Sequence, residues 1–101
     1  MLKIQVSPTR HVFIDFKHER YEPPIINGSC LISGITRAWV YTAKESPIPV
    51  GIGMAMCSVL DNFNRAKGRK FALANALKQV NLSLEERKAL WEQYFSMVQD
   101  H

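Results

Sequence analysis

The sequence contains few cysteines and no long hydrophobic run. Its 101 residues include only two cysteines, Cys30 and Cys57, which are too few for the disulfide framework of a small secreted domain. No stretch approaches the ~20 consecutive apolar residues that a membrane-spanning helix needs. Met1 leads directly into an alternating pattern, without the apolar segment of a signal peptide. We therefore expect a small, soluble, reduced protein of the cytoplasm.

Extremes of composition are also absent. Hydrophobic residues make up 47% of the chain and charged residues 22%, a balance that excludes intrinsic disorder and low complexity. Thirteen basic and nine acidic residues leave a net charge of +4, which is mildly basic and far from histone-like. A chain of 101 residues has enough apolar material for one core, so we predict a single domain spanning residues 1–101.

The first half of the chain alternates apolar and polar residues with the period of two that half-buried strands require. Residues 2–6 and 10–17 are predicted to form a hairpin around a turn at Pro8. One set of side chains would face the core: Leu2, Ile4, Val12, Ile14, Ala38 and Val40. The other set would face outward: Lys3, Gln5, His11, Phe13, Asp15, Arg37, Trp39 and Tyr41.

The middle of the chain mixes strand patterns with turn signals. We interpret residues 18–29 as a loop, because they hold two prolines and Asn27-Gly28. Residues 30–33 and 36–42 then flank Gly34 as a second predicted hairpin. A last strand over residues 50–57 alternates large side chains with small ones such as Gly51 and Gly53, which would allow a helix to approach its backbone closely.

From Asp61 onward the apolar residues recur at helical spacing. Asp61 is a candidate N-cap, and Gly68 interrupts this first helix at a cost of about 1 kcal/mol. Ser83 and Glu86 form a capping-box pattern that predicts the start of a second helix. The predicted apolar positions are Phe63, Ala66, Leu73, Leu77 and Val80 in the first helix, and Leu84, Leu90, Trp91, Tyr94, Phe95 and Val98 in the second.

These patterns together predict an α+β domain. Residues 1–57 would form a mainly antiparallel sheet of four to five strands, and residues 61–99 a helical hairpin on one face of that sheet.

The basic charge is concentrated in the first predicted helix. Residues 61–80 hold five basic residues against Asp61, an excess equal to the net charge of +4 of the whole chain. Like charges four residues apart, as in Arg65 and Arg69, destabilise a helix unless an anion lies between them. This pattern indicates either a solvated helix face or an anion site. The candidate phosphate-binding residues are Arg65, Lys67, Arg69 and Lys70.

The outward face of the predicted sheet carries a second candidate surface. Its members are Phe13, Arg37, Trp39 and Tyr41. Aromatic and basic side chains on an open sheet can stack the bases of nucleotides or single-stranded nucleic acid. Exposed aromatic clusters also form oligomer interfaces. The sequence leaves both interpretations open.

Signatures of catalysis and metal binding are weak. His11 and His18, with Asp15 and Glu19, lie within nine residues of one another, but on a strand they would point to both faces. Isolated cysteines do not match the ligand spacing of a zinc site, and no glycine-rich phosphate loop precedes a helix. We therefore assign no catalytic residue, metal or cofactor.

One segment resembles a known group of proteins. The pattern Cys57-x3-Asp61-x-Phe63-x4-Gly68-Arg69-x2-Ala72-Leu73 is similar to a motif in small phage and prophage proteins, and it covers about a fifth of the chain. The resemblance implies an accessory phage protein, of a kind that often counters host defence.

The leading functional hypothesis is a non-enzymatic phage protein in the host cytoplasm that inhibits an antiviral defence pathway. It would sequester an anionic nucleotide signal or block a nucleic-acid-dependent effector, and we expect a homo-oligomer. Its partners would be a nucleotide, a nucleic acid or a host defence protein, and not a membrane. The alternatives are a DNA- or RNA-binding phage regulator and a small phosphodiesterase that uses His11 or His18.

Overall fold

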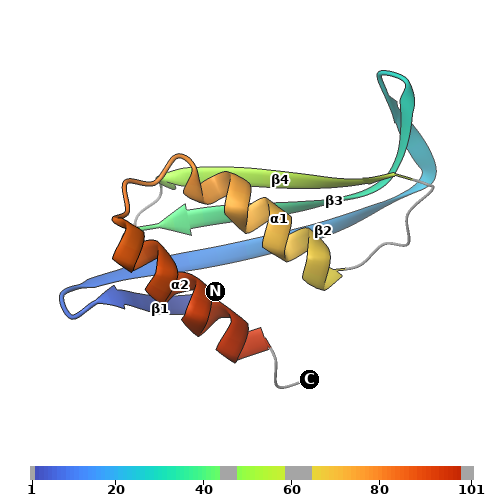
Figure 1. The fold of residues 1–101 in the computed structure, drawn as a ribbon. Coiled ribbons are helices and arrows are strands. Elements are labelled where there is room, and N and C mark those ends of the chain that lie inside the picture. The colour runs from blue at the N-terminus through green and yellow to red at the C-terminus, as the bar shows by residue number, and fades with distance from the viewer. Residues whose placement is uncertain (1, 44–47, 59–64, 99–101) are drawn as a thin grey trace.

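The computed structural model describes residues 2–43, 48–58 and 65–98 of the chain. The elements are, in order, β1 (Leu2–Ser7), β2 (Arg10–Asn27), β3 (Cys30–Tyr41), β4 (Gly51–Ser58), α1 (Arg65–Leu77) and α2 (Leu84–Val98). The strands form one antiparallel sheet in the order β1-β2-β3-β4, with both helices on the same face (Figure 1). The α+β class is therefore confirmed, with four strands. Within the described ranges, no helix is long and apolar enough to cross a membrane.

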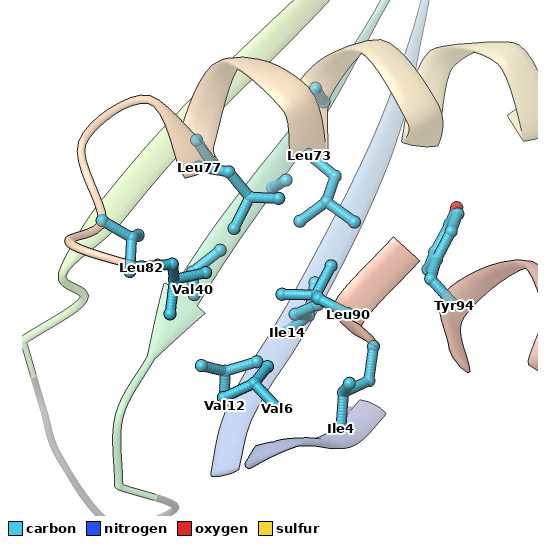
Figure 2. Close-up of a cluster of buried hydrophobic side chains, with 14 residues drawn as sticks. Ile4, Val6, Val12, Ile14, Val40, Leu73, Leu77, Leu82, Leu90 and Tyr94 are labelled. Atoms are coloured by element: carbon cyan, nitrogen blue, oxygen red, sulfur yellow. The ribbon is translucent and has the colours of Figure 1, made fainter. Parts of the chain in front are cut away.

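The core lies between the sheet and the two helices (Figure 2). Helix α1 packs over β3 and β4, and α2 packs over β1. The buried cluster consists of Ile4, Val6, Val12, Ile14, Ala38, Val40, Ala72, Leu73, Ala76, Leu77, Val80, Leu82, Leu90 and Tyr94. The predicted inward face of the sheet is thus confirmed.

Two of the apolar positions predicted for the helices are wrong. Ala66 and Leu84 are exposed, because each lies in the first turn of its helix, before the helix reaches the core. Phe63, together with the candidate cap Asp61, lies outside the described residues.

The interpretation of residues 18–29 as a loop is also wrong, because β2 continues to Asn27. The pairing of β2 with β3 changes register between Arg20 and Ile25, and both prolines lie inside that irregular stretch. A proline nitrogen has no hydrogen to donate to a ladder, so an interruption of this kind lets the strand continue past it. The strand ends at a tight turn in which Gly28 adopts a φ of +64°.

Gly34 does not form the turn of a second hairpin. Residues 30–41 are one continuous strand, in which Gly34 is buried and pairs with Arg20 on one side and Cys57 on the other. A glycine with strand partners on both sides contributes to close packing, so the turn signal was misleading here.

The close approach predicted for residues 50–57 is confirmed. A side chain at Gly53 would overlap the carbonyl oxygen of Ala72, and one at Gly51 would overlap that of Ala76. Helix α1 therefore lies with its backbone directly on β4. The large side chains that alternate with these glycines, Ile52, Met54 and Met56, consequently face away from α1 and are 49%, 43% and 53% exposed.

Each edge of the sheet is bordered by a glutamine from the helical layer. At β4, the Gln79 amide accepts from the backbone N–H of Ile52 at 3.3 Å and donates to the Ile52 carbonyl at 2.7 Å. At β1, Gln93 of α2 makes the same two bonds to the backbone of Gln5. These amides occupy the groups through which a further strand would pair.

Candidate anion-binding site

Arg65 and Arg69 lie on the side of α1 that faces His18 of β2. Their spacing of four residues places them on one side of the helix. Arg69 is half-buried and Arg65 is exposed. Burial lowers the pKa of His18, and the charges of Arg69 and then Arg65 lower it further. The imidazole is therefore biased toward its neutral form by two neighbouring guanidinium groups.

Arg69 also reaches across to α2. Its guanidinium lies near enough to the hydroxyl of Tyr94, a residue only 2% exposed, to act on the pKa of that phenol. Burial raises the pKa of Tyr94, and the nearby Arg69 guanidinium opposes that rise. In Figure 2 the Tyr94 hydroxyl points toward α1. The Arg69 guanidinium of α1 and the Tyr94 phenol of α2 therefore lie near each other.

Gly68 explains how α1 brings Arg69 close to the sheet. A Cβ at Gly68 would overlap Oγ1 of Thr36, a buried residue of β3. The Thr36 hydroxyl in turn lies 2.8 Å from Nδ1 of His18. Gly68 therefore allows the first turns of α1 to rest on Thr36, which places the neighbouring Arg69 beside His18.

The chemistry of this cluster suits an oxyanion. A guanidinium is permanently charged, and its planar donors match the oxygens of phosphate or carboxylate groups. Within residues 2–43, 48–58 and 65–98, no carboxylate forms an ion pair with Arg65 or Arg69. The cluster of Arg65, Arg69, His18 and Tyr94 is called the arginine site below.

The two lysines among the predicted phosphate-binding residues each lie near an aromatic ring. Lys67 lies with its Nζ 5.8 Å from the ring centroid of Phe71, and Lys70 lies 5.8 Å from that of Phe95 on α2. Both distances are in the range of cation–π contacts. Only Arg65 and Arg69 act together on His18.

Sequence reasoning named His18 and Tyr94 but did not connect either of them with Arg69. His18 has the same parity as Val12 and Ile14, so extending the predicted strand by one residue beyond Lys17 would have placed it on the face toward the helices. No sequence signal connects Thr36 or Tyr94 with Arg69, because these contacts arise from how the helices lie on the sheet.

The second candidate surface lies on the face that α1 and α2 leave open. Phe13 pairs with Tyr41 across the strands, and the neighbouring pairs are Asp15 with Trp39 and Lys17 with Arg37. The predicted aromatic residues therefore do share one face, where all three are half-buried. This surface is called the outer sheet face below.

Arg37 is already paired on the outer sheet face. It donates to Oε1 of Glu19, and Lys17 lies 3.6 Å from the same oxygen. Burial alone would raise the pKa of Glu19, but hydrogen bonds and charges from Tyr21, Arg37 and Lys17 keep it below its usual value. An arginine whose charge is balanced in this way is a weaker group for binding phosphate.

The histidines and cysteines form no further site. His11 pairs with Gln5 on the outer sheet face, whereas His18 lies on the inner face, so the two cannot act together. Cys30 and Cys57 are both free thiols. Among the described residues, no group of three or more His, Cys, Asp or Glu side chains is arranged to hold a metal ion.

Comparison of the chain with family models, with curated proteins and with solved structures finds no significant match.

Proposed function

We propose that this protein is a non-enzymatic binding protein whose arginine site captures the phosphate group of a small anion. The observation that supports the proposal is that Gly68 of α1 rests on Thr36, the hydrogen-bond partner of His18, so that the charges of Arg65 and Arg69 act on His18. A bound oxyanion would relieve the repulsion between two cations four residues apart on one helix. It would also accept hydrogen bonds from the N–H groups of the two guanidinium side chains.

The phosphate would belong to a nucleotide. Two arginines offer donors for one or two phosphate groups, which is the scale of a nucleotide and much smaller than a long polyanion. With the resemblance of residues 57–73 to phage proteins, this supports a phage-encoded inhibitor that sequesters an anionic nucleotide signal of host antiviral defence. Sequestration needs binding without turnover, so the protein would release the nucleotide unchanged.

The alternatives fit the geometry less well. Binding of DNA or RNA needs several cations along one surface, whereas Lys67 and Lys70 each lie near an aromatic ring. A phosphodiesterase would have to use His18 without His11, since the two lie on opposite faces of the sheet.

The test measures thermal stability of the full chain with inorganic phosphate, pyrophosphate, ATP and a cyclic dinucleotide. Ligand at a hundred times its Kd stabilises a folded protein by about 2.7 kcal/mol, which raises Tm by several degrees. Arg69→Ala and Arg65→Ala should each abolish the rise. Lys78→Ala, which removes an exposed cation just after α1, is the matched control and should retain it.

Three results would count against the proposal. One is that no phosphate-bearing probe raises Tm, and another is that Arg69→Ala responds like Lys78→Ala. The third is chemical conversion of a nucleotide, detected by chromatography after incubation, which would indicate an enzyme. Binding of a single-stranded oligonucleotide that weakens by orders of magnitude with modest added salt would favour the nucleic-acid alternative.

A further inference from the structure

The half of the outer sheet face formed by β3 and β4 is unusually apolar for a surface. It carries Trp39 and Tyr41 on β3, and Ile52, Met54 and Met56 on β4. The three residues of β4 are 49%, 43% and 53% exposed. Across the strands Ile52 pairs with Trp39, Met54 with Arg37 and Met56 with Ile35, so the patch is apolar except at Arg37, whose charge is paired with Glu19. Contiguous exposed apolar patches of this kind mark interaction surfaces. This patch is called the apolar surface below.

Nothing in the packing of β4 allows these side chains to turn inward. The opposite side of the strand consists of small residues, and the Ala72 carbonyl of α1 lies where a side chain of Gly53 would be. Because a strand presents alternate residues to its two faces, Ile52, Met54 and Met56 must point outward. Their burial therefore requires another molecule.

A partner cannot cover this surface by adding a strand to β4. Gln79 bonds both backbone groups of Ile52, and Asn75 donates to the carbonyl of Met54 at 2.9 Å. The edge is thus occupied where a new strand would pair. The partner must instead pack against the face of the sheet.

The distribution of charge favours a second copy of the same chain. Asp15, Lys17 and Glu19 of the outer sheet face lie on β2, and Arg37 of β3 is ion-paired with that Glu19. The excess positive charge lies on α1, on the opposite side of the sheet. When two apolar surfaces meet face to face, the two basic helices stay on the outside and do not repel each other closely.

We propose that two copies of this chain pair through their apolar surfaces, forming a two-layer β-sandwich with the helices outside. Packing of sheet on sheet is a common solution for two apolar faces, and a two-fold axis makes the contact self-complementary. Met54 and Met56 can adapt their shape to the facing layer. A stable dimer of this kind buries about 800 Å² of surface on each copy. The proposal of a dimer is independent of the proposed function of the arginine site.

The test is the oligomeric state of the full chain, measured by light scattering after size exclusion and by sedimentation over a wide range of concentration. We expect a dimer that dissociates on dilution. Dissociation should expose Trp39 to water and shift its fluorescence emission to the red, and this shift should be absent from the Trp39→Phe variant. Met54→Lys places two like charges in the interface and should give a monomer. Ile26→Lys is the matched control, because Ile26 is 78% exposed at the tip of the β2–β3 hairpin, away from the apolar surface.

A wild-type chain that stays monomeric at the highest concentration would overturn the proposal. So would a Met54→Lys variant that remains as dimeric as Ile26→Lys. Circular dichroism checks that both variants fold, which exposed positions should permit. Arg65→Ala and Arg69→Ala should leave the dimer intact, so failure of the anion site and failure of the dimer give different results.

Discussion

Gln79 bonds both the backbone N–H and the carbonyl of Ile52, and in this way acts as a short substitute for a neighbouring strand. Gln93 does the same for Gln5 at the opposite edge of the sheet. Because each glutamine comes from the helical layer, the layer that covers the core also closes both edges. This arrangement leaves the apolar surface, and not a sheet edge, as the place where another molecule can pack.

Removing the Gln79 amide should expose the β4 edge. We expect Gln79→Ala to lower the free energy of unfolding by about 1 kcal/mol, since it loses two solvent-accessible hydrogen bonds. The variant should also aggregate faster, because unpaired strand groups template further pairing. Urea denaturation and light scattering at fixed concentration measure the two effects. Lys78→Ala is the control. If both variants aggregate at the same rate, Gln79 does not protect the β4 edge.

The two glycines under α1 should differ in their tolerance of alanine. At Gly53 a methyl group meets the backbone of Ala72, which can move only if the helix moves, so Gly53→Ala should lose about 1–3 kcal/mol. At Gly68 the obstacle is the Thr36 side chain, and alanine also favours a helix by about 1 kcal/mol over glycine. Gly68→Ala should therefore lose less. Equal midpoints of urea denaturation for the two variants would contradict this order.

Local pattern was sufficient to predict most of the fold. The period-two residues Ile4, Val12 and Ile14 are all fully buried, as expected, and Ser83 caps the N-terminus of α2. The errors occur where tertiary packing overrides a local signal. Gly34 resembles a turn residue, but its two strand neighbours hold it extended.

The contacts around the candidate site could not be predicted from the sequence, for a similar reason. Arg65 and Arg69 follow from charge and helical spacing, which a sequence displays directly. Their partner Tyr94 is 25 residues beyond Arg69 on another helix, and only the placement of α1 and α2 on the sheet brings the two together. Lys67 and Lys70 are candidates on their charge alone, and their positions near the rings of Phe71 and Phe95 appear only in the structure.

The capping box of α2 should make a measurable contribution to stability. The Ser83 hydroxyl accepts from the N–H of Glu86 at 3.1 Å, and the Glu86 carboxylate accepts from the N–H of Ser83 at 3.0 Å. The bond to Ser83 is the main cause that lowers the pKa of Glu86. Ser83→Ala should lower the free energy of unfolding by about 1 kcal/mol in chemical denaturation. Ser96→Ala, an exposed position late in α2, should change stability little; a loss as large as that of Ser83→Ala would argue against the cap.

Protonation of His18 should destabilise the fold in mildly acidic solution. Burial, Arg69 and Arg65 lower the pKa of His18 in the folded protein, so the unfolded chain takes up this proton at higher pH. The folded protein keeps the full stability that the neutral imidazole provides at pH values above the ordinary histidine pKa of about 6.5. This stability is lost as the pH decreases from that value toward the lower pKa of His18 in the folded protein. The urea concentration at the unfolding midpoint should therefore decrease when the pH is lowered from neutral to about pH 5, and His18→Gln should reduce that decrease. His11→Gln, on the outer sheet face, is the control. A fall that His18→Gln leaves unchanged would show that other groups cause it.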